Sequence, residues 1–278
     1  AFFERIQTIV ELRDSTNMPV LGGIPHYDDI EEHPLSILND SRSAVTEAFR
    51  SLRANLQYML TRSESKLLLI SSLHPGEGKS FTASNLAAVL AKTGKSVALI
   101  DFDMHKPKVH KNMGLDNKKG LSTVLIGRAQ LADVLRPGPV ENLSVCTAGP
   151  VPPNASELVM GDQTLELLKE LRSRFDFILL DTPPILLISD AIILMQHVDA
   201  GLLVTNTEKS SKRSINHLES VLAQNQLSAS FILNNIQMNR WQRVYSKYAY
   251  KYGYGYGYGY GYGYGYGSGG YGEPSEEA

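Results

Sequence analysis

The residues best suited to chemistry lie in a glycine-rich turn between an apolar run, Leu67–Ser71, and a stretch of helical spacing, Phe81–Lys92. Glycines let backbone N–H groups point inward around phosphate oxygens at a helix start, where a lysine reaches the terminal phosphates and a hydroxyl binds Mg²⁺. Leu73 departs from the general pattern, which has glycine there; an ordinary turn with a solvated lysine is the alternative, disfavoured by the flanking strand and helix. We predict an ATP- and Mg²⁺-binding loop made by Pro75, Gly76, Glu77, Gly78, Lys79, Ser80 and Phe81.

Three aspartates follow buried strands elsewhere in the chain. Asp101 and Asp103 come at and after the end of the run Ser96–Asp101, and Asp181 ends the run Phe177–Asp181. Open α/β sheets bind ligands beyond the carboxyl ends of their strands, so we expect these carboxylates near the glycine-rich turn. There they can hold Mg²⁺ directly or through water, and one can accept the proton of an incoming hydroxyl. A helix N-cap or a turn is the alternative role for Asp181.

The elements that must position these residues alternate between apolar runs and helical stretches. Further strands are predicted at Leu143–Thr147, Gly201–Asn206 and Ser230–Asn234, and further helices at Val45–Leu60, Thr164–Arg174 and Ser214–Gln224. Runs apolar enough to be buried on both faces indicate a parallel sheet covered by helices on both sides. The prediction is a doubly wound α/β domain with a mostly parallel sheet over residues 41–244.

The two ends of the chain differ from this domain. Residues 1–40 are predicted to form a lead-in, in which Met18–Pro25 is extended and lies against the core. Residues 245–278 form a tail of alternating tyrosine and glycine, for which we expect disorder because glycine raises the entropy cost of ordering. A sticky or adhesive low-complexity segment is one reading of this tail, and a set of phosphate acceptors is the other. The tyrosines concerned are Tyr250, Tyr252, Tyr254, Tyr256, Tyr258, Tyr260, Tyr262, Tyr264, Tyr266 and Tyr271.

Composition limits the possible functions. The 278 residues are 42% hydrophobic, which allows one substantial core, and the net charge of −2 gives no field that would hold nucleic acid. The single cysteine, Cys146, fits a reducing compartment, and the longest apolar run, Ile185–Met195, is too short to span a membrane. The chain opens without an initiator methionine, so we expect a cytosolic piece of a longer protein.

Taken together in this order, the motifs resemble the bacterial tyrosine kinase family, the cytoplasmic engines of capsule and exopolysaccharide export. The resemblance covers nearly the whole chain and is carried by Pro75–Ser80, Asp101–Pro107, Asp181–Pro184 followed by Ser189–Ala191, and the tyrosine tail. It implies a P-loop fold of the branch that includes the partition ATPases. It also implies an enzyme at the cytoplasmic face of the bacterial inner membrane, attached to its own transmembrane part, with a phosphotyrosine phosphatase as a partner.

The resemblance assigns roles to single residues. Lys79 and Ser80 would bind phosphate and Mg²⁺, Asp101 and Asp103 would serve catalysis and metal, and Asp181 would serve the metal and its water shell. Asn234 would contact adenine by the same analogy, although asparagine at a strand end is more often a turn residue.

Three residues of the predicted helix Val45–Leu60 add to this resemblance, and two histidines differ from the residues that related proteins have at the same positions. Glu47, Arg50 and Arg53 resemble the family's E-x-x-R-x-x-R motif, which implies contact with a neighbour in a ring; a solvated helix face with a weak ion pair is the alternative. His105 stands where the family usually has arginine, a charge role that would pass to Lys106 or Lys108. His74 stands where partition ATPases carry a signature lysine, which favours the kinase branch.

The predicted reaction is transfer of the ATP γ-phosphoryl group to a tyrosine of the tail, largely between subunits of a ring. Asp101 would orient the phenol and accept its proton late, because an ordinary carboxylate cannot deprotonate a phenol beforehand. A ParA-like switch ATPase that hydrolyses ATP with water is the main rival. A non-enzymatic nucleotide-sensing module with a structural tail is the third hypothesis.

Overall fold

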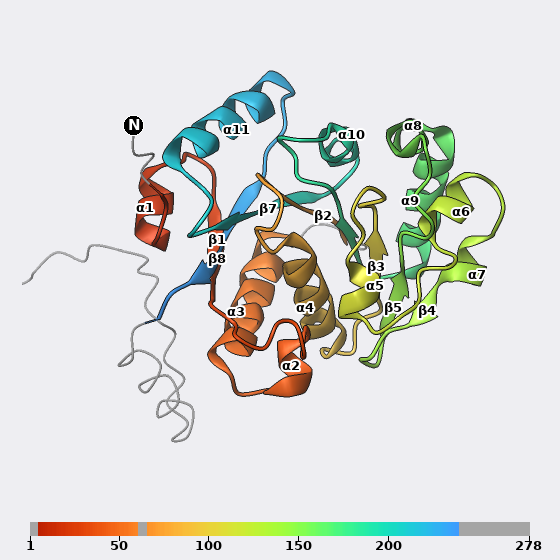
Figure 1. Cartoon of the computed structure of the whole chain (residues 1–278), viewed down its shortest axis with the longest axis horizontal. Helices are drawn as coiled ribbons and strands as arrows, with labels where there is room; N and C mark the ends of the chain where they lie inside the picture. Colours follow the sequence, from red (N-terminus) through yellow and green to blue (C-terminus); the bar gives the residue numbers. More distant parts are fainter. Residues whose placement is uncertain (1–4, 61–65, 239–278) are drawn as a thin grey trace, which may run out of the picture.

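The computed structural model describes residues 5–60 and 66–238. The tyrosines of the predicted tail lie outside these residues. The described chain folds around one eight-stranded sheet with the strand order β1-β8-β7-β2-β6-β3-β5-β4 (Figure 1). Its strands are β1 (Val20–Pro25), β2 (Lys66–Ser72), β3 (Val97–Asp101), β4 (Arg136–Pro137), β5 (Leu143–Cys146), β6 (Phe177–Asp181), β7 (Ala200–Asn206) and β8 (Ser230–Ile236).

All of the strand pairs are parallel except β4 with β5, so the predicted mostly parallel sheet is confirmed. The six predicted strands correspond to β2, β3, β5, β6, β7 and β8. The two strands not predicted as such lie at the sheet edges. β1 pairs with β8 and comes from the expected extended segment of the lead-in, while β4 is only two residues long.

Helices cover both faces of the sheet (Figure 1). They are α1 (Ile9–Asp14), α2 (Ser36–Asn39), α3 (Ala44–Met59), α4 (Lys79–Ala91), α5 (Val109–Asn112), α6 (Leu121–Leu125), α7 (Leu131–Val134), α8 (Ala155–Met160), α9 (Asp162–Arg174), α10 (Asp190–Met195) and α11 (Lys212–Gln224). Buried residues of α2, α3, α4 and α5 pack on one face, and those of the other helices pack on the opposite face. The doubly wound arrangement follows directly.

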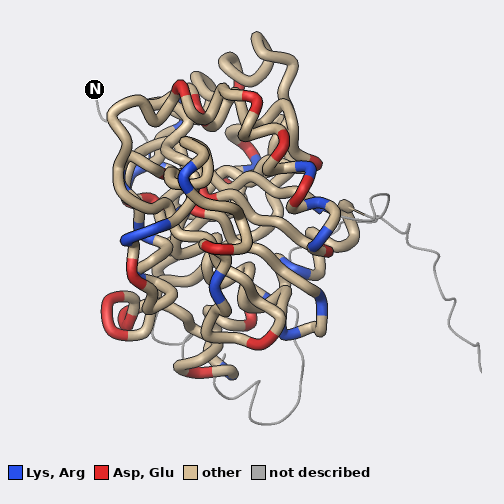
Figure 2. The backbone as a smooth tube through the Cα atoms, turned by 90° about the vertical axis from the view of Figure 1, so that its right-hand side faces the viewer, with Lys and Arg blue, Asp and Glu red and all other residues tan. Residues whose placement is uncertain are grey.

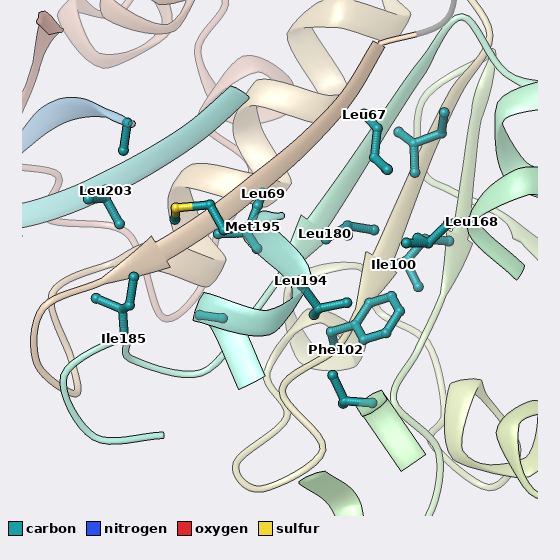
Figure 3. Packing of buried hydrophobic residues seen from close by; sticks show 14 of the residues in the cluster. Leu67, Leu69, Ile100, Phe102, Leu168, Leu180, Ile185, Leu194, Met195 and Leu203 are labelled. Carbon is teal, nitrogen blue, oxygen red and sulfur yellow. The ribbon is translucent and has the colours of Figure 1, made fainter. Parts of the chain in front are cut away.

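Alternation along the strands builds both cores at once. In β2, Leu67 and Leu69 belong to one core, whereas Leu68 and Ile70 belong to the other, because successive side chains point to opposite faces. Figure 3 shows the first of these cores, where Leu69 and its neighbours on adjacent strands meet side chains of α9 and α10. A strand buried on both sides needs an apolar residue at every position, which explains the continuous apolar runs of the sequence.

Helix α4 joins the phosphate-loop sequence to the sheet. Every residue of α4 is buried, because the helix lies between the strands and α2, α3 and α5. Small and apolar residues make up most of this helix, which suits a position in the protein interior. Helix α3 is amphipathic instead, and the Ser43 hydroxyl caps it by accepting a hydrogen bond from the Thr46 amide.

The distribution of charge and the environment of the single cysteine are further features of the fold. Acidic and basic residues are interspersed over the described chain in Figure 2, in keeping with the small net charge. Cys146, at the end of β5 and beside Ile100 of β3, is fully buried, and this burial raises the pKa of its thiol to about 12. None of the helices in the described residues is both long enough and apolar enough to cross a membrane.

Candidate functional site

The glycine-rich turn closes over the carboxyl end of β2 and leads into α4 at Lys79. Gly76 and Gly78 have φ angles of +78° and +99°, a region that residues with side chains rarely adopt. A Cβ atom at Gly78 would collide with the side-chain amide of Asn234, and one at Gly76 would collide with the ammonium of Lys209. Both glycines are therefore required by the backbone, and Gly78 is also required by the close approach of Asn234.

Lys79 and Ser80 are the first two residues of α4, and both contact carboxylates from neighbouring strands. Lys79 Nζ lies 2.8 Å from Asp103 Oδ2 and 3.4 Å from both oxygens of Asp181. The Ser80 hydroxyl donates to Asp181 Oδ2 at 2.5 Å. The structure thus brings together residues from positions 79 to 181 that the sequence placed on three separate elements.

The three aspartates form a buried acidic group. Asp101 and Asp181 are register partners on β3 and β6 and are fully buried, and Asp103 is 3% exposed. Asp101 accepts hydrogen bonds from the amides of Asp103 and Val109, at 3.1 and 3.2 Å. Its carboxylate is therefore fixed by backbone donors on the loop that follows β3.

Burial and mutual repulsion act on the pKa values of this group. Burial, and then the charge of Asp181, raise the pKa of Asp101 well above its usual range. Burial also raises the pKa of Asp181, against the opposing effect of Lys79. For Asp103 burial acts in the same direction, but Lys79 outweighs it and the pKa falls. Three buried carboxylates facing one ammonium group are short of positive charge.

This shortage is the observation that fits a divalent cation. Carboxylate and hydroxyl oxygens are the ligands of Mg²⁺, which keeps several waters and binds through one or two carboxylates together with substrate phosphates. Ser80, Asp103 and Asp181 supply such oxygens. No cluster of three or more histidine, cysteine or acidic side chains arranged to hold a metal by itself occurs within residues 5–60 and 66–238. The donor set suits a metal shared with a nucleotide rather than a closed protein site.

A further buried carboxylate, Glu77, supports the loop from the protein interior. Glu77 is fully buried and accepts hydrogen bonds from the Ser210 hydroxyl at 2.6 Å and from the His74 amide at 2.7 Å. Burial raises the pKa of Glu77 to about 7, although these hydrogen bonds oppose the shift. Asn234 donates to the Glu77 carbonyl at 2.9 Å, and Lys209 donates to the Pro75 carbonyl at 3.0 Å. The loop is thus tied to the connection between β7 and α11 and to β8.

The other residues predicted to contact the nucleotide are Asn234, Phe81 and Pro75, and each has a different environment in the structure. Asn234 lies inside β8 rather than after it, and its side chain reaches the loop. The ring of Phe81 packs between Tyr27 and Phe49, with centroid distances of 5.7 and 5.6 Å, so a contact with nucleotide would come from its backbone. Pro75 takes part through its carbonyl group, which is held by Lys209.

Several residues around the site had no sequence signal. Ser210 and Lys209 follow an ordinary strand, and serines and lysines are common in such connections. His105 contacts Asp190 at 3.2 Å, so the position where the family has arginine pairs with a fully buried carboxylate. The resemblance to the Ser189–Ala191 motif was the one signal for Asp190.

The predicted interface residues lie along α3. Glu47 and Arg50 pair with each other one turn apart. Arg53 donates to the Val89 carbonyl of α4 at 3.4 Å, and burial lowers the pKa of its guanidinium. These contacts lie within one chain, so the role of the three residues between subunits stays a prediction.

Comparison with known proteins places this geometry in a family. The AAA domain model matches residues 65–236. The chain is 36% identical to the tyrosine-protein kinase YwqD from Bacillus subtilis over 77% of its own length and 89% of that relative. The chain belongs to the bacterial tyrosine-protein kinase family. The kinase domain of the Escherichia coli tyrosine kinase ETK has a TM-score of 0.80 at 28% identity, over 84% of this chain and 96% of that domain.

Two further comparisons show how far the similarity extends. The septum site-determining protein MinD from Pyrococcus horikoshii, solved with Mg-ADP, has a TM-score of 0.52 at 29% identity, over 61% of this chain and 70% of that structure. This bacterial tyrosine-protein kinase chain spans about a third of the length of the Salmonella tyrosine-protein kinases that it matches. The similarity therefore extends most fully to kinase domains and less fully to the ATPase.

Proposed function

We propose that this chain is an ATP- and Mg²⁺-dependent protein-tyrosine kinase whose substrate is its own C-terminal tyrosine cluster. The observation that carries the proposal is the contact of Lys79 with both Asp103 and Asp181. It joins a phosphate-binding loop to acidic groups suited to a metal and to an attacking hydroxyl. The tail of alternating tyrosine and glycine supplies many tyrosine acceptors.

In this proposal the loop and α4 bind the triphosphate. Backbone amides around Gly76 and Gly78 and the start of α4 face the phosphates, and Lys79 exchanges a carboxylate partner for phosphate oxygens. Ser80, Asp103 and Asp181 hold Mg²⁺, which neutralises charge on the transferred group when it is bound. Because the transition state of phosphoryl transfer is loose, alignment and charge stabilisation account for most of the catalysis.

Asp101 has the environment expected of the group that receives the phenol proton. Its two oxygens are fixed by the amides of Asp103 and Val109, so its orientation is set before the substrate arrives. Because a phenol has a pKa near 10, a carboxylate held in this position accepts the proton late, once the bond to phosphorus is forming. We assign Asp101 the orientation of the tyrosine hydroxyl and acceptance of its proton.

The test separates a kinase from a switch ATPase. The full chain is incubated with ATP and Mg²⁺, and phosphotyrosine and free phosphate are measured together. We expect phosphotyrosine to exceed free phosphate in the native chain and to disappear in Lys79→Met, while Lys169→Met, a matched change of an exposed lysine on α9, has no effect. Free phosphate without phosphotyrosine would instead identify an ATPase, and Lys79→Met with native activity would refute the loop assignment.

We also propose that transfer takes place between subunits of a ring held through Glu47, Arg50 and Arg53. The tail beyond Lys251 has a root-mean-square reach of about 30 Å as a flexible chain, which suits a neighbour's site. Mixing Lys79→Met chains with active chains truncated after Lys247 should label the tail of the inactive partner. If label never appears there, transfer occurs within one chain or the interface lies elsewhere.

The ring would respond to its own product. Each phosphotyrosine adds about −1.5 to −2 charges, so five would add on the order of −8 to −10 to a tail that already carries Glu273, Glu276 and Glu277. Repulsion among such tails should dissociate the ring, an effect that light scattering can follow and that salt should weaken. By analogy with the family, we place the chain at the cytoplasmic face of the inner membrane, with its own transmembrane part, a phosphotyrosine phosphatase, and polysaccharide export as its context.

A further inference from the structure

Five exposed lysines follow the proposed catalytic aspartates and, apart from the charge role predicted for Lys106 or Lys108 in place of the family's arginine, have no function in the proposed reaction. They are Lys106, Lys108, Lys111, Lys118 and Lys119, here called the lysine segment. None of them forms a salt bridge with another residue of the described chain. Between positions 104 and 119 the only acidic residue is Asp116, which pairs with Arg136 at 2.8 Å. The segment thus exposes uncompensated positive charge.

Hydrogen bonds attach this segment directly to the site. The Lys106 amide donates to Asp103 Oδ1 at 2.9 Å, and the Val109 amide donates to Asp101. Asn112 donates to the Ser80 carbonyl at 3.1 Å. Further along, Asn117 exchanges hydrogen bonds with Gly149 beyond the end of β5, the strand next to β3. The lysines are therefore carried on a connection that borders the catalytic edge of the sheet.

The far end of the chain has the opposite charge. After Lys251 the only charged residues are Glu273, Glu276 and Glu277, and Tyr271 lies two positions before the first of them. Glu273 lies seven positions after Tyr266, a stretch that spans at most about 25 Å. A tail held by its glutamates beside Asp103 would keep the last acceptor tyrosines within reach of the site.

We propose that the lysine segment is a docking surface for the acidic end of the tail, Glu273–Glu277, of a neighbouring copy of this chain. This inference rests on the proposed function, and it names the part of the substrate that the kinase recognises. The glutamates bind to the lysines, and the flexible Tyr–Gly repeat is thereby concentrated at Asp101 and Asp103. Recognition of a charged end, rather than of any one tyrosine, allows many positions to be phosphorylated in turn.

Peptide binding tests the inference without any catalytic step. A fluorescein-labelled peptide of residues 260–278 is titrated with the full chain in the absence of ATP, and anisotropy is recorded. The same peptide with Glu273, Glu276 and Glu277 changed to glutamine should bind about 10-fold more weakly, because three exposed ion pairs are lost. Equal binding of the two peptides would overturn the inference.

Charge reversal places the contact on the protein. Lys111→Glu/Lys119→Glu should weaken the native peptide by about 10-fold or more and should strengthen a peptide in which the three glutamates are lysines. Arg128→Glu/Lys169→Glu makes the same change in net charge at exposed positions elsewhere and should alter either affinity less than about 2-fold. Equal effects of the two double variants would show that the peptide responds only to the net charge of the protein, and would refute the docking surface.

Kinetics separate this inference from the proposed function. In the kinase assay Lys111→Glu/Lys119→Glu should raise the KM for the peptide and leave the KM for ATP unchanged. A variant that instead weakened ATP binding and left peptide binding unchanged would assign the lysines to the nucleotide. A chain with no kinase activity that still bound the peptide through these lysines would refute the proposed function and retain the docking surface.

Discussion

Glu77→Gln should remove one pH-dependent contribution to the stability of this protein. Glu77 is fully buried without an ion pair among the described residues, and burial raises its pKa from 4.5 to about 7. Between these values the unfolded chain has lost the proton while the folded chain keeps it. The free energy of unfolding therefore falls as pH rises, by about 3 kcal/mol in total from this group.

The glutamine variant removes that pH-dependent loss and adds a fixed one. Its amide oxygen can still accept from the His74 amide while its nitrogen donates to the Ser210 hydroxyl, but the nitrogen carries one more hydrogen than the protonated carboxyl, and leaving that N–H buried without a partner costs about 1–2 kcal/mol at all pH values. We expect Glu77→Gln to be less stable than the native chain at pH 5 and about 1–2 kcal/mol more stable at pH 8. The two stability curves should cross between about pH 5 and pH 6, where the pH-dependent loss of the native chain equals the fixed loss of the variant.

Urea denaturation followed by circular dichroism at pH 5, 6, 7 and 8 measures both curves. The other buried carboxylates, Asp101 and Asp181, are common to both proteins, so their effects cancel in the difference. Glu208→Gln, an exposed change on the same connection as Ser210, corrects for net charge. Parallel curves for the native chain and Glu77→Gln would refute the assignment of a buried, proton-binding Glu77.

Nucleotide binding offers an independent measurement of the same group. Phosphates in the loop oppose ionisation of Glu77, so ATP binding near pH 7.5 should be accompanied by proton uptake. Calorimetry in buffers of different ionisation enthalpy should detect this uptake in the native chain and a smaller one in Glu77→Gln. An identical uptake in both would place the proton on another group.

Two further predictions concern the loop glycine and the helix α3. Gly78→Ala should lose nucleotide affinity and about 1–3 kcal/mol of stability, because the new methyl group meets Asn234 and the φ angle is positive. Gly94 also has a positive φ angle, +81°, but has open space around it, so Gly94→Ala should lose stability without losing nucleotide affinity. Equal nucleotide affinity in the two variants would contradict this prediction. Arg50→Ala/Arg53→Ala should run as a monomer in sedimentation. A double variant that still assembles would remove α3 from the interface.

The parts of the site that could be predicted are those encoded by neighbouring residues. The turn from β2 into α4 was recognised because strand, glycines, Lys79 and helix are consecutive in the sequence. The convergence of Asp101 and Asp181 followed from a general property of parallel sheets, whose carboxyl ends meet at one edge. In each case local sequence carries the information and topology supplies the rest.

The parts that could not be predicted depend on distant pairings. Ser210 reaches Glu77 across 133 positions, and a serine after a strand carries no signal of such a contact. The edge strand β1 contains Gly22, Gly23 and Pro25, residues that strands disfavour, and it forms because β8 offers a free edge about 200 positions away. A contact between residues far apart in the sequence leaves no local pattern around either residue.

The burial of Cys146 makes the protein its own reporter of local opening. With a thiol pKa of about 12, only about one molecule in 10,000 would carry a thiolate at pH 8, and the sulfur has no access to solvent while the helices on its face of the sheet remain packed. A thiol reagent can therefore react only when this part of the core opens. Because Ile100, the register partner of Cys146 on β3, belongs to the same core and directly precedes Asp101, the rate of alkylation at the sole cysteine would measure how often the core beside the proposed catalytic carboxylate opens.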